Sequence, residues 1–410
     1  MTTSSPLSSS STPLVWSEDY FGGAWLVRGF DDVEQGLRDT RLSARRTGGW
    51  LHKNQPEATE PAETTQATQA TIRPFQGMLA RALLFVDAPD HGRLRGVMMG
   101  AFQPHALQAL GERLRAQVRR LLDDIDPTEP FDFIQRIAQP VPAQVVSQML
   151  GLDYTQAEAA LRSATDLAAF IEHPDPSPEM IQRAQRSALA MAGLWRRWLD
   201  GDGDGDRDGA PKVIDPNAPD ALLSRLLAAH RAGRIESREE LLAQCVTLLF
   251  AGHETTRHLL GLALDALLAD PALRSEAQRD SATMRRAVRE VLRHSSPVKY
   301  TARRVGVPFT WHGHALRRGE LVLLMVAQAN RDATHFREPD QLDLRRDEGM
   351  HLAFGVGPHV CIGAALTQLE AEIVLTEVLT RWPNLHRVAG AVRIESGLYQ
   401  GWRSLPVSAA

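Results

Sequence analysis

The longest helical pattern in the sequence limits the possible fold more than any other feature. It begins at "SREE", where Ser237 and Glu240 have the spacing of a capping box, whose side chains bind the free amides of a first helical turn. The pattern continues until Asp270–Pro271 ends it, which predicts one helix of about 32 residues and about 48 Å. Because the part before Gly252 is apolar on nearly all sides, we expect this helix to run through the middle of the protein.

Helical patterns also dominate the rest of the chain, with short strand patterns between them. Strands are expected at 24–30, before a short helix, and within 316–332, before a turn into a helix or loop. Further helices are expected at about 91–101, 105–124, 140–150, 155–172 and 178–199. The sequence therefore predicts a mainly α protein with small β-sheets.

Composition narrows the class of protein. The 410 residues are 43% hydrophobic and 23% charged, which is typical of a globular protein, and the net charge of -4 gives no support for nucleic-acid binding. Cys245 and Cys361 are too few for a disulfide framework or a four-cysteine metal site. Residues 1–15 lack the features of a signal peptide and are expected to form a disordered tail. The longest apolar run, within 241–252, is shorter than a bilayer span of about 20 residues, so we expect a soluble cytoplasmic protein.

Two polar segments are expected to be loops. Residues 53–75 are rich in Thr, Gln and Pro, and residues 202–220 are rich in Asp and Gly. The segment from Asp204 to Asp215 matches several positions of an EF-hand calcium loop. However, Pro211 occupies the bridge position and the last ligand is aspartate rather than glutamate, so a solvated loop is the preferred interpretation.

The motif "AGHETT" interrupts the apolar pattern of the long helix. Gly252 would let a bulky group approach the backbone, and the Thr255 hydroxyl can bind a backbone carbonyl and loosen the helix. Glu254 would be costly to bury without a partner or a water path. An acid beside an alcohol at a helix distortion suits a proton relay. A simple helix bend with Glu254 at the surface explains the residues equally well.

The stretch "FGVGPHVCIG" places Cys361 just before a long helical pattern, where amides and the helix dipole stabilise a thiolate. Such a thiolate can be a nucleophile or a soft metal ligand. For nucleophilic catalysis His359 would be the base, but its spacing of two residues rarely allows that transfer. An inert buried thiol is the alternative for any cysteine and the preferred interpretation of Cys245.

Together these two stretches resemble motifs of the cytochrome P450 family, namely its haem-binding loop and its central-helix oxygen motif. "REVLRHSSPV" contains Glu290 and Arg293 at the family's E-x-x-R spacing, and "DAPDHGRLRGVMMGAF" resembles its H-x-x-x-R helix. Spacing alone would predict a surface ion pair for Glu290 and Arg293. The resemblance implies that both lock with a further arginine, matched by Arg346. It extends over nearly the whole chain, with the motifs in the family's order.

The resemblance implies non-covalent haem b (iron protoporphyrin IX), with Cys361 as the axial thiolate on iron. It implies that Phe354 packs against the sulfur, that Gly357 lets the loop approach the porphyrin, and that Gly363 belongs to the same cofactor-binding loop. The haem propionates would be bound by His91, Arg95, Arg303 and His359. Since one haem gathers residues from 91 to 361, residues 16–410 are expected to form a single catalytic domain of the P450 fold. The chain departs from the family's usual residues at Gly92, Leu342 and Thr367–Gln368.

The resemblance further implies a monooxygenase that activates O2, with Glu254 and Thr255 relaying protons. Two electrons would come from NAD(P)H through a ferredoxin reductase and a ferredoxin. The substrate would be a mid-sized hydrophobic small molecule of specialised metabolism, in a pocket drawn from Val246, Phe250, Val298, Lys299, Tyr300, Thr301, Leu398 and Tyr399. Epoxidation, desaturation, C–C coupling or nitration at the same site, and a haem-based ligand binder without turnover, remain open alternatives.

Overall fold

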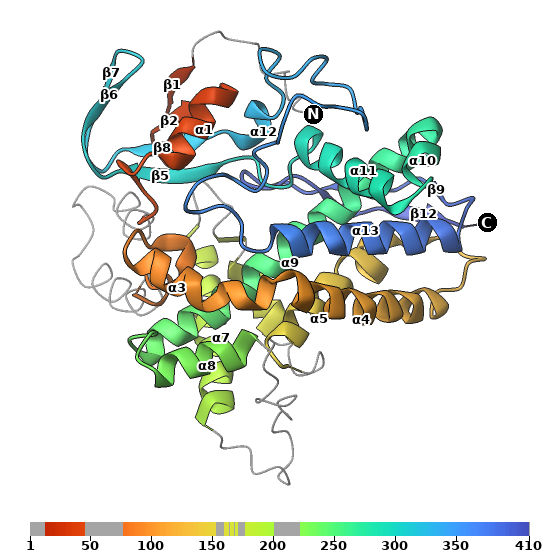
Figure 1. The fold of residues 1–410 in the computed structure, drawn as a ribbon, viewed down its shortest axis with the longest axis horizontal. Helices are drawn as coiled ribbons and strands as arrows, with labels where there is room; N and C mark the ends of the chain where they lie inside the picture. Colours follow the sequence, from red (N-terminus) through yellow and green to blue (C-terminus); the bar gives the residue numbers. More distant parts are fainter. Residues whose placement is uncertain are drawn as a thin grey trace.

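The computed structural model describes residues 13–45, 77–152, 160–163, 165–167, 169–170, 177–200 and 222–409. The expected loops at 53–75 and 202–220, including the calcium-loop match, lie outside these ranges, as does much of the expected helix at 155–172. Within them, helices form most of the molecule and a small sheet region lies at one corner (Figure 1). The predicted fold class, mainly α with small β-sheets, is confirmed.

The expected helices that lie within the described residues are present, with boundaries close to those that the sequence predicts. The α-helices are α1 (Phe30–Arg38), α3 (Asp90–Met98), α4 (Pro104–Asp123), α5 (Pro140–Met149), α7 (Pro178–Asp200), α8 (Leu222–Arg231), α9 (Arg238–Ala269), α10 (Pro271–Ala277), α11 (Ser281–His294), α12 (Val326–Ala329) and α13 (Ala364–Arg381). Shorter helical turns are η2 (Leu83–Phe85), η3 (Met99–Phe102) and the π-helix η4 (Ile134–Ala138).

The long helix α9 has 32 residues and the predicted ends. The Ser237 hydroxyl accepts a hydrogen bond from the Glu240 amide at 3.1 Å, as in a capping box. The Glu240 carboxylate does not accept the second hydrogen bond of a capping box, from the Ser237 amide. Instead it accepts a hydrogen bond from the Glu236 amide at 2.7 Å and forms an ion pair with Arg93 of α3 at 2.7 Å. The start of α9 is therefore held by α3 as well as by its own cap.

The strands form four small sheets. They are β1 (Leu14–Ser17), β2 (Ala24–Val27), β3 (Leu42–Ser43), β4 (Phe131–Asp132), β5 (Thr301–Val305), β6 (Phe309–Trp311), β7 (His314–Leu316), β8 (Leu321–Leu324), β9 (His386–Arg387), β10 (Val392–Arg393), β11 (Trp402–Ser404) and β12 (Pro406–Ser408). The largest sheet has the order β1-β2-β8-β5-β3, with β2 and β8 parallel. Because β1 begins at Leu14, the expected disordered tail overlaps this sheet by two residues, which is a correction to its boundary.

Two large apolar clusters meet along α9. Its first half, up to Phe250, packs in a cluster with α3, α5, α7 and α8. Its second half, from Leu259, packs in a cluster with α4, α11 and α13. Residues 251–258 belong to neither cluster, so the "AGHETT" segment lies at the junction of two cores. None of the helices in the described ranges is both long and apolar enough to cross a membrane.

Candidate active site

The loop that carries Cys361 is shaped by two glycines. Gly355 and Gly357 have φ values of 67° and 76°, which favour glycine. The resulting turn lets the Cys361 amide donate to the Phe354 carbonyl at 2.8 Å. Gly363 then caps the first turn of α13. This arrangement fixes the sulfur at the start of a helix.

The Cys361 side chain is accessible, although it lies deep in the protein. Burial raises the pKa of its thiol, while the Gly363 amide and the Arg95 charge act in the opposite direction. The sulfur is thus available to a ligand, while the surrounding protein disfavours its charged form. The raised pKa favours the thiol, and binding of a metal ion would favour the thiolate.

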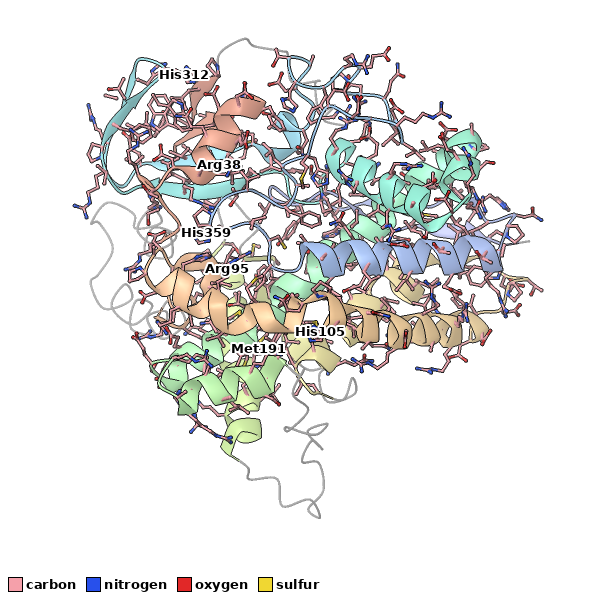
Figure 2. All side chains as sticks on the ribbon, in the orientation of Figure 1. Arg38, Arg95, His105, Met191, His312 and His359 are labelled. Atoms are coloured by element: carbon pink, nitrogen blue, oxygen red, sulfur yellow. The ribbon has the colours of Figure 1, made fainter. Side chains whose placement is uncertain are left out.

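A cluster of basic side chains lies beside this loop. Arg95 of α3 donates to the Val360 carbonyl at 2.8 Å, and the His91 and His359 rings are 4.0 Å apart between their centroids. Figure 2 shows Arg95 and His359 together between α3 and the sheet region. Burial and the charges of Arg95 and Arg303 lower the pKa of His91. The structure thus brings together all four residues that were expected to face the propionates.

This cluster fits an anionic group. Arg303 is 5% exposed and donates to Thr301 Oγ1 and to the Ala302 carbonyl. Burial lowers its pKa to about 10, against a smaller opposing effect of Asp87. Among the described residues, no carboxylate hydrogen-bonds to Arg95 or Arg303. Buried cations need a counter-charge, and the two carboxylates of a haem would supply it next to the accessible sulfur.

The "AGHETT" segment makes the expected hydroxyl–backbone contact, but α9 continues through it as an unbroken α-helix, so the expected distortion is not present. The Thr255 hydroxyl donates to the Ala251 carbonyl at 3.2 Å, and Ala251 itself is exposed in spite of its place in a core helix. Gly252 faces elsewhere, because a Cβ there would lie 3.1 Å from the Val146 side chain of α5. The close approach that was expected at Gly252 is therefore made by helix α5. The exposed residue of this turn is Ala251.

Glu254 is buried rather than at the surface, which removes the simple helix-bend explanation. Its carboxylate pairs with Arg257 at 3.1 Å and lies 3.5 Å from His253 Nδ1 and 3.7 Å from His258 Nε2. Burial raises the pKa of Glu254, but Arg257, His253 and His258 outweigh it and the net pKa is lowered. The sequence analysis missed these partners, although spacings of three and four residues place Arg257 and His258 on the Glu254 side of the helix.

Comparisons with known proteins agree with this geometry. The family model described as "Cytochrome P450" matches residues 211–384. The chain is 31% identical over 389 residues to Cytochrome P450 107B1 of Saccharopolyspora erythraea, which covers 94% of this chain and 89% of the relative. The chain belongs to the cytochrome P450 family. It is also 32% identical to Cytochrome P450 monooxygenase PikC of Streptomyces venezuelae, over 88% of this chain and 78% of the relative.

The structure of epothilone D-bound cytochrome P450epoK is similar to this P450, with a TM-score of 0.80 and 26% identity. That similarity covers 97% of this chain and 93% of the other. This P450 is accordingly an oxygenase whose family binds haem iron.

The E-x-x-R residues form a buried ion-pair network in this P450. Arg293 binds Glu290 with two hydrogen bonds of 2.7 and 2.9 Å, and Arg346 donates to the same carboxylate at 3.0 Å. Arg293 also donates to the carbonyls of Asn330, Pro339 and Gln341. The network therefore ties α11 to the segment that leads into the Cys361 loop.

The expected pocket residues fall into two groups. Val298 and Tyr399 pair as a β-bridge, and the Lys299 amide donates to the Leu398 carbonyl at 2.8 Å. Tyr300 and Leu398 pack in one small cluster, and Thr301 begins β5. Val246 and Phe250 lie in a different cluster on α9. Lys299 Nζ donates to the Ser396 carbonyl at 2.6 Å, so this lysine holds the turn at 396–399.

Two loop residues have contacts that the resemblance did not specify. A Cβ on Gly357 would lie 3.3 Å from the Leu37 carbonyl, so this glycine also lets the loop approach α1. Phe354 is partly buried against the large cluster around α13, and its ring lies 5.8 Å from that of His351.

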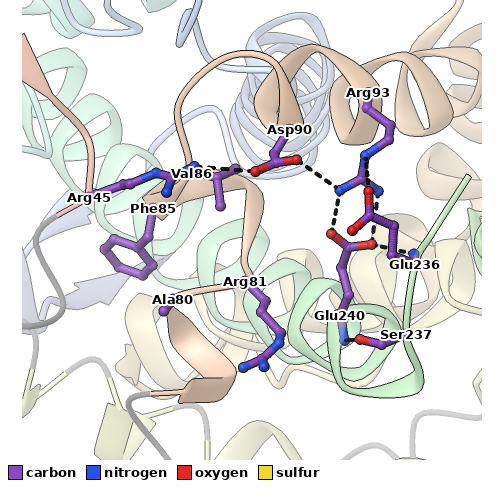
Figure 3. A pocket seen from close by; sticks show the side chains of 10 residues that line it. All are labelled: Arg45, Ala80, Arg81, Phe85, Val86, Asp90, Arg93, Glu236, Ser237 and Glu240. Carbon is purple, nitrogen blue, oxygen red and sulfur yellow. Dashed lines mark hydrogen bonds and ion pairs between the residues drawn. The ribbon is translucent and has the colours of Figure 1, made fainter.

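A separate polar pocket of about 370 Å³ lies between α3 and the start of α9 (Figure 3). Two of its three arginines are paired with its own acids: Arg93 binds Asp90 and Glu240, and Arg45 pairs with Asp90 at 3.2 Å. The third, Arg81, donates to the Gly77 carbonyl. None of its lining residues is an expected site residue. We therefore treat it as part of the α3–α9 connection.

Proposed function

We propose that this P450 uses two electrons from a ferredoxin, reduced by NAD(P)H through a ferredoxin reductase, to hydroxylate a mid-sized hydrophobic molecule. The observation that carries the proposal is the accessible Cys361 thiol beside Arg95 and Arg303, to which no carboxylate of the described residues hydrogen-bonds. Bound haem b would supply iron for O2 activation, with the Cys361 sulfur as its ligand. Residues 16–410 would act as one catalytic domain.

Each residue of the site has a role in this proposal. Arg95, Arg303, His91 and His359 bind the haem carboxylates, and the Gly363 amide stabilises the anionic sulfur. Thr255 holds a proton at Oγ1 within reach of the Ala251 carbonyl. Glu254, next to it in the chain, resupplies that proton. The pocket residues at 298–301, 398–399, 246 and 250, most of which are apolar, exclude water and orient the substrate.

Relatives support the substrate class. One relative in Bacillus subtilis is named a polyketide biosynthesis cytochrome P450, and the similar P450epoK structure holds epothilone D. We therefore propose that the substrate of the present chain also belongs to specialised metabolism. Because the candidate pocket residues are mostly apolar, the binding affinity is expected to increase with the hydrophobic surface area of the ligand.

The test is turnover with a surrogate ferredoxin, its reductase and NADPH, against a panel of polyketides, terpenoids, fatty acids and peptides. A shift of the haem absorption on binding identifies ligands, and mass spectrometry of the products distinguishes hydroxylation from epoxidation, desaturation, coupling or nitration. NADPH consumption with an oxygenated product supports the proposal. Ligand binding with neither product nor peroxide would show a haem-based binder instead.

A further inference from the structure

Glu254 is surrounded by three basic side chains, but only one of them makes a close contact. Arg257 Nη2 lies 3.1 Å and Nε 3.2 Å from Glu254 Oε2. His253 Nδ1 and His258 Nε2 are 3.5 and 3.7 Å from the carboxylate, which is longer than a normal hydrogen bond. The carboxylate is therefore held from one side, by an arginine of its own helix.

Arg257 is also the only lasting positive charge that acts on this carboxyl group among the described residues. Burial lowers the pKa of both imidazoles, that of His258 to about 3, so both are neutral near pH 7. Arg257 is the largest of the influences that oppose burial, so removal of the guanidinium would shift the balance towards the protonated carboxyl, which burial favours.

The exposure of these side chains shows where the ion pair can open. Glu254, His253 and His258 are 4%, 3% and 1% exposed, whereas Arg257 is 16% exposed. Movement of Arg257 would uncover Glu254 Oε2 without disturbing either imidazole. No other cation of the described residues lies within 4 Å of the carboxylate.

We propose that Arg257 is a positioning residue that holds Glu254 as an ion-paired carboxylate between turnovers and releases it to take up each proton. This deepens the proposed function and rests on it, because it takes Glu254 as the acid of the relay. When Arg257 moves away, a hydronium ion gives one proton to Glu254 and becomes water. By way of water the carboxyl group then gives this proton to Thr255 Oγ1, and the Thr255 hydroxyl gives its own proton to the reduced dioxygen. Glu254 is again a carboxylate and re-forms its pair with Arg257.

The test measures the protonation of Glu254 directly, by infrared spectroscopy of the ferric holoenzyme at pH 7. The spectrum of the wild type minus that of Glu254→Gln should contain no protonated carboxyl band. Arg257→Gln should gain one such band, which Glu254→Gln removes when the two are combined. Arg257→Lys, the matched control, retains a charge and should gain none. Glu370, which is itself buried and favours its protonated form, contributes equally to all variants and cancels.

Titration of the wild type alone provides a second measurement should Arg257→Gln fail to fold. Its Glu254 band should appear only below the ordinary pKa of a glutamate. A protonated Glu254 at pH 7 in the wild type, or no new band in a folded Arg257→Gln, would overturn the proposal. Unchanged NADPH-driven product yield in Glu254→Gln would instead overturn the relay in the proposed function, and the infrared result would still report on Arg257.

Discussion

The hydroxyl oxygens of Thr256 on α9 and Thr367 on α13 lie 3.4 Å apart. This contact joins the helix that carries Glu254 to the helix that begins after Cys361. Thr367 is one of the positions where the chain departs from the usual residues of its family, and the structure gives that departure a partner. The two halves of the candidate site are thus linked by a hydroxyl pair as well as by apolar packing.

We expect Thr367→Val to lower the free energy of unfolding by about 1 kcal/mol, because it leaves the Thr256 hydroxyl without this partner. Urea unfolding of Thr256→Val, Thr367→Val and the double variant measures the interaction. Since contacting residues are not additive, the double variant should lose at least about 0.5 kcal/mol less than the sum of the single losses. Additive losses would show that the hydroxyls do not interact.

Arg293 and Arg285, both on α11, should differ sharply in their effect on stability. Arg293 is 2% exposed and binds Glu290, whereas the Arg285 side chain is 57% exposed and lies 3.8 Å from Glu372. Arg293→Met leaves Glu290 with one cation fewer and should cost about 3–5 kcal/mol or abolish folding. Arg285→Met, the control, should cost less than about 1 kcal/mol in the same urea experiment. Similar losses in both variants would contradict the buried network.

The buried carboxyl of Glu370 predicts a dependence of stability on pH. Burial raises its pKa well above 4.5, and none of the described residues hydrogen-bonds to its Oε2. Between pH 4.5 and the raised pKa, the folded state keeps this proton and the unfolded state releases it, so the wild type loses stability as pH rises. The glutamine in Glu370→Gln cannot titrate, so the stability of this variant should fall less than that of the wild type as pH rises. Urea midpoints from pH 4.5 to 8 measure the difference, and parallel curves for both proteins would contradict the assignment.

Arg303 should have opposite effects on the haem-free and haem-bound proteins. Without haem it is a buried cation that no described carboxylate binds, so Arg303→Met should stabilise the haem-free protein by about 1 kcal/mol. With haem, loss of a charged hydrogen bond of about 1.5–3 kcal/mol should speed haem transfer to apomyoglobin by about tenfold or more. Arg304→Met, on the other face of β5, is the control and should leave transfer unchanged. A less stable haem-free protein together with unchanged haem transfer in Arg303→Met would show a purely structural arginine.

Local signals in the sequence were sufficient for α9. Ser237 and Pro271 fix its ends through nearby backbone groups, so the boundaries follow from the residues themselves. The same spacing arguments would have placed Arg257 and His258 beside Glu254. The cluster of Arg95, Arg303 and His359 is different, because it joins α3, β5 and the Cys361 loop, and the family resemblance alone brought these residues together before the structure.

Contacts between elements that lie far apart in the chain could not be predicted from the sequence. The position of Gly252 against Val146 depends on how α5 crosses α9, and the Thr256–Thr367 contact depends on α13. The parallel pairing of β2 with β8 likewise depends on the whole chain between them. Each of these requires the relative placement of two packed elements, which local propensity does not determine.

The central claim is that Cys361 binds haem iron as a thiolate. The most direct test is the absorption spectrum of the reduced, carbon monoxide-bound protein. The account predicts a maximum near 450 nm that is lost in Cys361→Ser, because the thiolate ligand produces it. A maximum near 420 nm in the gently purified wild type, or one near 450 nm that persists in Cys361→Ser, would contradict it.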